Sequence, residues 1–241
     1  MRSLQSSVFS RQWVLVVVTL AATSVRAGDW HLDAELLTDL PVEIGGRVGV
    51  EMPYGLRAST SVGYMPAGYV KLINAILTSA HAYNDATADL IQATIQKSLV
   101  WRTHVGWRLP GHGFYVDLGY GLVGLGGGAT GEELIAAVTG QKRASEESGE
   151  HPYDVASALH MIDGEVGWIW DLPYHLTVRT ALGVAATLKA RAKVEAAFEP
   201  RPLFQKGVDA FEAYAEDYLV TTFETYVITP VFTVALGYRF F

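Results

Sequence analysis

The C-terminal segment 227–241, VITPVFTVALGYRFF, constrains the fold more than any other part of the chain. Successive side chains of a strand point to opposite faces. The large apolar residues of this segment share one face: Ile228, Pro230, Phe232, Val234, Leu236, Tyr238 and Phe240. In a soluble protein such an aromatic terminal strand invites edge-to-edge pairing. A transmembrane barrel, in contrast, closes with a strand of this kind, and its aromatic residues lie at a membrane interface.

Residues 1–27 have the pattern of a secretory signal peptide. Arginines precede and follow an apolar run, 13–22, and the small residues Val25 and Ala27 mark a cleavage site after position 27. The run is shorter than the about 20 residues that a membrane-spanning helix needs. We therefore expect 1–27 to be removed and 28–241 to form one barrel domain.

Composition excludes several classes of function. Removal of 1–27 takes away three arginines and no acid, so the formal net charge falls from −7 to about −10. An acidic surface argues against nucleic acid as a partner, and the absence of cysteine excludes disulfides and thiol chemistry. Half of the residues are hydrophobic (50%), yet no later run is long enough for a transmembrane helix. The hydrophobicity is spread by alternation, as in a transmembrane barrel.

Alternation of apolar and polar residues predicts eight strands. They are 30–37, 42–52, 56–65, 99–109, 114–125, 155–170, a long strand from 174 onward, and 227–241. Tight turns are expected at 53–55, 110–112 and 171–173, and a short connection at 38–41. The outward face of the seventh strand begins with Leu176 and continues, more weakly, through Ala192 and Val194. Proline removes a ladder donor, so Pro230 predicts a local bulge.

Three longer inserts have apolar residues at helical spacing. They are 67–96, 127–154 and 199–218. In the first insert, Asn84 and Asp85 separate two short helices. Before the second, glycines 126–128 predict a flexible lead-in, and Thr130 with Glu133 has the spacing of a capping box. We expect these helices to cap the barrel mouth, or to dock a partner or the acyl chains of lipid A.

Together these patterns predict an all-β fold: an eight-stranded antiparallel up-and-down transmembrane β-barrel with short helices in the extracellular loops. Short turns are typical of the periplasmic side and long loops of the exterior, which places both termini in the periplasm. Aromatic residues then form a girdle at the periplasmic rim: Trp30, Trp107, Trp168, Trp170, Tyr238 and Phe240. A soluble lipocalin-like barrel fits the alternation too, but it explains neither the girdle nor the apolar C-terminus.

The inward positions of this barrel carry charges of both signs. The predicted interior network is Glu51, Arg57, Arg102, Arg108, Asp117, Glu165, Arg179 and Arg239. Asp33, Glu43, Arg47 and Asp163 are expected to face inward as well. Eight strands leave an interior just wide enough for side chains to fill it, so we expect a charge-compensated plug. Hairpin folding places Glu51 opposite Arg57, and Glu165 opposite Arg179. His31, His104 and His175 are expected to face inward.

The run Tyr238-Arg239-Phe240 resembles the C-terminal signature of bacterial outer-membrane barrel proteins, and the architecture resembles the small group that includes the OmpA transmembrane domain and OmpX. The resemblance implies a Gram-negative outer-membrane location and contact with outer-membrane lipid. It also implies recognition of the last strand by the barrel-assembly machinery. We expect a monomer.

No arrangement of histidines, serines and carboxylates matches a catalytic motif, so no catalytic, cofactor-binding or metal-binding residue is assigned. The acidic residues around Glu146 and Asp154 indicate a solvated loop rather than a cation site. The leading hypothesis is a non-enzymatic protein with a structural or surface-interaction role, whose external loops meet an unknown ligand. The alternatives are a small gated channel or transporter and a lipid-modifying enzyme.

Overall fold

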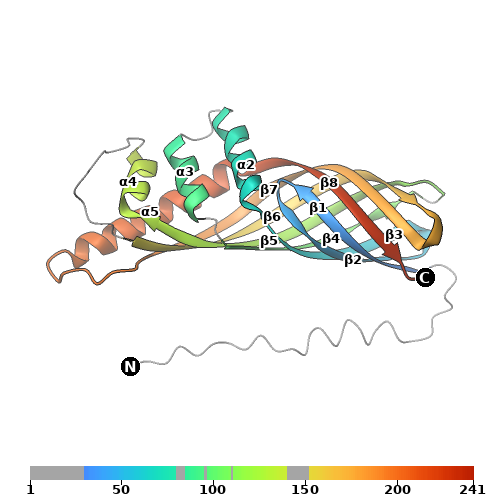
Figure 1. Cartoon of the computed structure of the whole chain (residues 1–241), viewed down its shortest axis with the longest axis horizontal. Helices are drawn as coiled ribbons and strands as arrows, with labels where there is room; N and C mark the ends of the chain where they lie inside the picture. The colour runs from blue at the N-terminus through green and yellow to red at the C-terminus, as the bar shows by residue number, and fades with distance from the viewer. Residues whose placement is uncertain (1–29, 80–84, 95–96, 110, 140–151) are drawn as a thin grey trace, which may run out of the picture.

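The computed structural model describes residues 30–79, 85–94, 97–109, 111–139 and 152–241, so the predicted signal peptide lies outside the described residues. Eight antiparallel strands form a closed barrel in chain order, with β8 paired to β1 (Figure 1). Their bounds are β1 His31–Leu40, β2 Glu43–Glu51, β3 Leu56–Tyr64, β4 Lys97–Arg108, β5 Phe114–Thr130, β6 Pro152–Asp171, β7 Leu176–Ala196 and β8 Ile228–Arg239. The predicted eight-stranded antiparallel barrel is confirmed.

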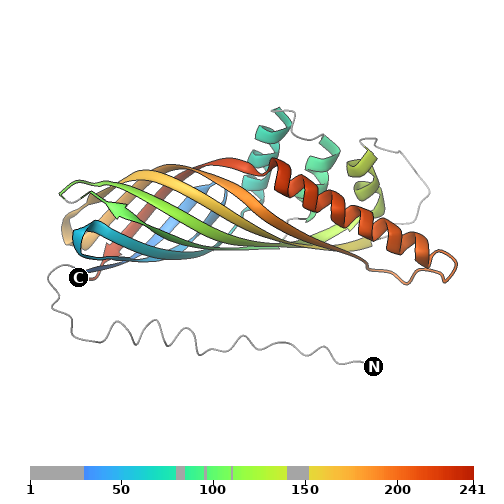
Figure 2. The same cartoon turned by 180° about the vertical axis from the view of Figure 1, so that it is seen from behind.

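The helices lie at one end of the molecule, opposite the C-terminus (Figures 1 and 2). They are α2 Ala67–Ser79, α3 Asp85–Thr94, α4 Gly131–Thr139 and α5 Gln205–Tyr226. The capping box before α4 is confirmed: Thr130 N–H donates to Glu133 Oε2 at 2.8 Å, and Glu133 N–H donates to Thr130 Oγ1 at 3.2 Å. The helix α5 continues to Tyr226, beyond the predicted limit at 218. None of the described helices is long and apolar enough to cross a membrane.

The tight turns lie at the other end. Two of them are short 3-10 turns, η2 Pro53–Gly55 and η3 Pro173–His175. Gly55 has φ of 82°, and a Cβ there would lie 2.0 Å from the carbonyl oxygen of Arg108, so the turn requires glycine. The hairpin of β6 and β7 turns at η3 and is centred on Tyr174. Arg179 therefore pairs with Ile169 rather than with Glu165, and the predicted register of this hairpin is wrong.

Two strands continue through segments that were predicted to be a turn and a flexible lead-in. The strand β1 continues through the predicted turn to Leu40, and Asp39 pairs with Glu43 and Thr233 within the sheet. The strand β5 continues to Thr130, so glycines 126–128 are not a flexible lead-in. They pair in register with β6, where Gly127 lies opposite Val155. Pairing along a neighbouring strand fixes the glycine backbone, which local composition cannot reveal.

Pro230 causes no bulge. It pairs with Val184 without a register shift. The Phe240 N–H donates to the Leu32 carbonyl of β1, and because hydrogen-bonding direction alternates along a strand, the backbone N of Pro230 also points to the β1 side. The strand β1 ends at Leu40, opposite Phe232, so Pro230 lies past its last residue. The missing N–H therefore costs no ladder hydrogen bond.

The irregularity lies in β7 instead. Lys189 pairs with His160 and Thr187 pairs with Met161, which leaves Leu188 as an extra residue. A bulge of one residue shifts the alternation, so every later side chain changes face.

The consequence is visible in the burial of β7. On the tight-turn side of the bulge, Val184 and Leu188 are exposed on the outer face. Beyond it, Lys189 and Arg191 are exposed and Val194 is buried. The predicted outward continuation through Ala192 and Val194 is therefore wrong. The prediction assumed that even-numbered residues stay outward along the whole strand, whereas odd-numbered residues face outward after the bulge.

The barrel interior also changes along its length. Inward side chains are charged toward the tight-turn end and apolar toward the helix end, where the strands β5, β6 and β7 extend beyond the others (Figure 1). The apolar faces of the helices pack against this extension. Their common core includes Val70, Leu90, Val100, Val123, Leu134, Tyr153, Leu159, Val194, Leu219 and Phe223.

The helix α5 covers the edge of β7 beyond the point where β8 pairs with it (Figure 2). Three glutamates of α5 accept hydrogen bonds from backbone N–H groups of β7: Glu212 from Ala196 at 2.7 Å, Glu216 from Val194 at 3.0 Å, and Glu224 from Ala190 at 2.9 Å. Glutamates four residues apart on the helix are about 6 Å apart along its axis, and N–H groups two residues apart on the strand are about 6.6 Å apart. The spacing of the carboxylates therefore matches the spacing of the N–H groups that they bind. The carboxylates protect a strand edge that would otherwise be open to pairing.

Candidate functional site

A belt of apolar side chains surrounds the half of the barrel nearest the tight turns. Each strand contributes an exposed residue: Leu36, Val48, Val62, Val105, Leu118, Val166, Leu182 and Leu236. Leu36 is 75% exposed, whereas its neighbour Leu37, on the inner face, is 4% exposed. Contiguous apolar surface of this extent on a protein exterior marks contact with a membrane or a partner.

The predicted girdle residues gather at the tight-turn rim of this belt. Trp107, Trp168, Trp170, Tyr238 and Phe240 are exposed, and Trp30 is half-buried. Tyr238 and Phe240 pack edge to face at 5.3 Å between ring centroids. Trp107 donates from Nε1 to the Tyr54 carbonyl at 2.7 Å, so the ring faces outward while its polar edge is satisfied.

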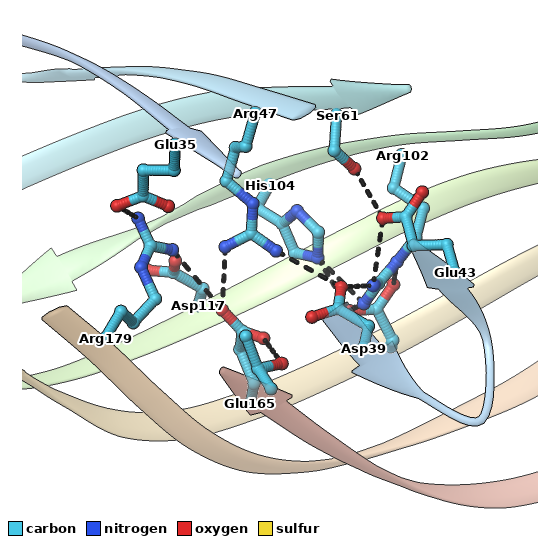
Figure 3. A network of polar contacts seen from close by, with 12 residues as sticks. Glu35, Asp39, Glu43, Arg47, Ser61, Arg102, His104, Asp117, Glu165 and Arg179 are labelled. Atoms are coloured by element: carbon cyan, nitrogen blue, oxygen red, sulfur yellow. Dashed lines mark hydrogen bonds and ion pairs between the residues drawn. The ribbon is translucent and has the colours of Figure 1, made fainter. Parts of the chain in front are cut away.

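The lumen holds a network of buried ion pairs, drawn in Figure 3. Arg102 Nη2 donates to Asp163 Oδ2 at 2.7 Å, and its Nη1 contacts Asp39. Arg47 reaches both Asp39, at 3.4 Å, and Glu165, at 3.5 Å. Three of these four contacts join strands that are not neighbours in the sheet, so the network crosses the lumen rather than following one wall.

A second group of contacts lies around Tyr115. The guanidiniums of Arg57 and Arg179 lie 4.4 and 5.3 Å from its ring centroid, and the Tyr115 hydroxyl donates to Glu165 Oε1 at 3.1 Å. Arg57 also lies 3.4 Å from Asp117. Cation–π contacts with Tyr115 and ion pairs with carboxylates hold both guanidiniums in place. Together these side chains fill the cross-section of the barrel.

Histidine and serine side chains complete the network. His104 Nε2 lies 2.8 Å from Asp163 Oδ2, and Ser61 Oγ donates to Glu43 Oε1 at 2.7 Å. His175, predicted to face inward, is instead exposed in η3 and lies 6.0 Å from the Tyr238 ring. His31 is half-buried, and its Nδ1 lies 3.1 Å from the carbonyl oxygen of Phe241.

The tight-turn mouth of the lumen is partly open to solvent. Arg108 contacts Glu51 at 3.2 Å and Asp171 at 2.7 Å, and Arg239 contacts Asp171 at 2.7 Å. Glu51 does lie opposite Arg57 in the register, but its carboxylate pairs with Arg108. A pocket of about 510 Å³ opens at this mouth. A separate cavity of about 10 Å³ lies beside Asp33 and Glu35, with room for about one water molecule.

All eight residues of the predicted interior network point into the barrel or its mouth. Sequence reasoning left Glu35 and Asp39 out of that network. Asp39 was assigned to a turn because the predicted first strand stopped at Leu37, although the alternation Asp33, Glu35, Leu37, Asp39 continues unbroken. Extending the strand to the next proline would have found it.

The buried charges nearly balance. Among the described residues, seven carboxylates and five arginines are buried. Burying an ion costs several kcal/mol unless partners repay it, and nearly every charge here has an opposite charge within reach. No described cluster of three His, Asp or Glu side chains is arranged to hold a metal ion. The chemistry of this interior is therefore mutual neutralisation within a closed cross-section.

These features define a class: a closed antiparallel barrel with apolar side chains outside and paired charges inside, which is the arrangement of transmembrane barrels. The chain is similar to several solved structures. The N-terminal β-barrel domain of OprF from Pseudomonas aeruginosa aligns with 88% of this chain and 97% of that one, at 8% identity and a TM-score of 0.38. A major outer membrane protein from Thermus thermophilus aligns with 89% of this chain and 100% of that one, at 13% identity and a TM-score of 0.44.

CarO from Acinetobacter baumannii aligns with 89% of this chain and 99% of that one, at 8% identity and a TM-score of 0.36. No protein-family model matches the sequence, and no curated protein matches it.

Proposed function

We propose that this chain is an integral protein of the bacterial outer membrane, with a non-conducting barrel that anchors a structured extracellular extension. The observation that carries the proposal is the inversion of polarity at Leu188. On one side of this bulge the exterior is apolar and the interior charged; on the other side Lys189 and Arg191 lie outside and Val194 lies inside. Such an inversion fits a chain that passes from lipid into water.

The dimensions agree with a membrane span. Along β7 the outward apolar face extends from Leu176 to Leu188, and a tilted transmembrane strand needs about 9–11 residues. Short turns at one end and long helical connections at the other favour a periplasmic position for the turns and both ends of the mature chain. Recognition of the β8 segment by the assembly machinery belongs to the same proposal.

The lumen supports a closed rather than a conducting barrel. Arg47, Arg102 and Arg179 are nearly fully buried and pair with carboxylates of strands that are not their neighbours. Beyond them, toward the helix end, the core beneath α2–α5 is apolar. An ion would have to displace paired charges and then cross that core. We assign the chain a structural and surface-interaction role, as a monomer, without catalysis.

A small gated channel is the second candidate, because the pocket of about 510 Å³ gives solvent access to the tight-turn mouth. Two measurements separate the possibilities. A heat-modifiable gel shift of the membrane-extracted protein, with planar-bilayer traces free of discrete conductance steps, supports the proposal. Stable conductance of the wild-type protein would contradict the closed lumen, and recovery in the soluble fraction without a gel shift would contradict the membrane barrel. Unchanged lipid A masses upon expression would support the non-enzymatic assignment.

A further inference from the structure

The outer face of the sheet just beyond the bulge carries a row of cations. Lys189, Arg191 and Lys193 alternate with inward residues and are all exposed. The row begins next to Leu188, which is 59% exposed and ends the apolar belt on β7. Cations thus follow the apolar surface directly, although the whole chain has a formal net charge of −7.

The strands beside Arg191 and Lys193 present a flat surface, whereas His160 lies opposite Lys189. The register places Ala158 opposite Arg191 and Ala156 opposite Lys193, and on β5 it places Gly126 opposite Ala156. We call this surface, made of the three cations with Ala156, Ala158 and Gly126, the basic face. Its floor has no side chain larger than a methyl group.

Packing within the described chain does not require the glycine. A Cβ added at Gly126 would have no atom within 4 Å. Glycine in the interior of a strand weakens the strand, and it often marks a site where another molecule approaches the backbone closely. The flat floor is therefore available to a ligand that lies against the sheet.

Charge indicates the chemistry of that ligand. Within the described part of the chain, Lys193 pairs with Glu195, whereas Lys189 and Arg191 have no ion-pair partner. An arginine beside a lysine matches a phosphate, since the guanidinium binds it through two parallel hydrogen bonds and the ammonium adds a point charge. Cations at this height above an apolar belt attract anionic headgroups of the membrane surface.

We propose that the basic face holds the phosphorylated headgroup of a glycolipid from the surrounding leaflet. Phosphate contacts Lys189 and Arg191, a sugar ring lies on the Ala158 and Gly126 floor, and the acyl chains continue along Leu188 and the apolar belt. The inference rests on the proposed function, because it requires the helix end to be outside the membrane.

The test uses the full chain, extracted in detergent and reconstituted in phosphatidylcholine vesicles with or without a bisphosphorylated glucosamine glycolipid. Retained glycolipid is measured by native mass spectrometry after extraction. The double variant Lys189→Gln/Arg191→Gln is compared with Arg201→Gln/Lys206→Gln, which removes the same charge from exposed positions at the far tip of the extension. We expect the first variant to lower retention by roughly fivefold for each cation removed, and the second to leave it unchanged.

Two further arms sharpen the result. Gly126→Ile fills the floor from a Cβ position that has no atom within 4 Å, so it should weaken retention while the extension stays folded. Dephosphorylated glycolipid should bind weakly, and inorganic phosphate should not compete at equal phosphate concentration, because it lacks the sugar and acyl contacts. Equal retention in wild type and Lys189→Gln/Arg191→Gln would overturn the inference.

The inference would also fail if Gly126→Ile converted a dimer to a monomer with retention unchanged, because the floor would then be an interface between copies. The heat-modifiable gel shift reports on the membrane barrel separately. A wild-type protein that shifts and inserts but retains no glycolipid contradicts the basic face alone.

Discussion

Arg179 of β7 donates a hydrogen bond of 2.8 Å to Glu35 of β1 inside the barrel, and both side chains are almost completely shielded from solvent. The two strands are separated by β8, so the pair spans the strand that closes the barrel. Glu35 thus takes part in closure, although the sequence pattern did not select it for the interior network.

Removal of Glu35 should therefore be costly. Glu35→Leu leaves the Arg179 guanidinium buried with only the more distant Glu165, at 3.8 Å, and breaking a buried pair costs about 3–5 kcal/mol. Urea titration of the folded gel band should report this loss. Glu35→Leu/Arg179→Met should recover most of it, because both members of the pair are then removed and Glu165 still pairs with Arg47. The matched control, Asp171→Leu at the half-exposed rim, should cost less than about 1 kcal/mol; equal losses at both sites would contradict a dry lumen.

The polarity inversion makes opposite predictions for two outward positions of one strand. Val166 lies in the apolar belt, and Ala156 lies beyond the bulge level on the same face of β6. An arginine on the lipid face near the membrane centre costs about 2–4 kcal/mol, so Val166→Arg should reduce the folded fraction in vesicles. Ala156→Arg should have almost no effect. Similar tolerance of both arginines would indicate that the exterior faces water along its whole length.

Deletion of residues at the bulge tests the phase of β7. Without Leu188, Lys189 follows the inward Thr187 directly and still pairs with His160, so no later side chain changes face. We therefore expect this single deletion to keep the wild-type digestion pattern. Deletion of both Leu188 and Lys189 instead turns Arg191 and Lys193 toward the apolar core beneath α5, so the extension should become protease-sensitive while the barrel retains its heat-modifiable shift. Equal protease resistance of the two deletion variants would contradict a fixed outward phase of this segment.

The glutamates of α5 offer a separate test of edge protection. Glu216→Leu leaves the Val194 N–H without its acceptor, which costs about 1–3 kcal/mol for a group removed from water. Glu216→Gln retains a carbonyl acceptor and should cost much less. Hydrogen exchange at Val194 should accelerate in the first variant only. Unchanged exchange in Glu216→Leu would mean that the carboxylate does not protect this edge.

The sequence predicted what depends on local alternation and failed where pairing partners decide. Trp107 outward and Arg102 inward follow from a period of two, and the capping box of Thr130 and Glu133 follows from spacing alone. The extra residue Leu188 carries no such signal, since a leucine is equally compatible with the outward apolar face before the bulge and with the inward apolar face after it. The position of Pro230 past the end of β1 likewise depends on a partner strand, and so does the ordering of glycines 126–128.

The network in the lumen divides in the same way. Whether a side chain faces inward depends only on its position in the alternation along its own strand. This alternation was sufficient to select residues such as Arg102 and Glu165. Which carboxylate meets which guanidinium depends on the register of strands that are not consecutive. Glu51 therefore lies opposite Arg57 yet pairs with Arg108.

Site-directed labelling tests the central claim most directly, because the chain has no cysteine of its own. Val184→Cys and Arg191→Cys place one thiol on the outer face of β7 on either side of the bulge, and a membrane-impermeant maleimide is applied to intact cells. We predict rapid labelling at position 191 and none at position 184 until the protein is unfolded. Equal labelling at both positions in the folded protein would contradict a lipid-facing belt that ends at Leu188.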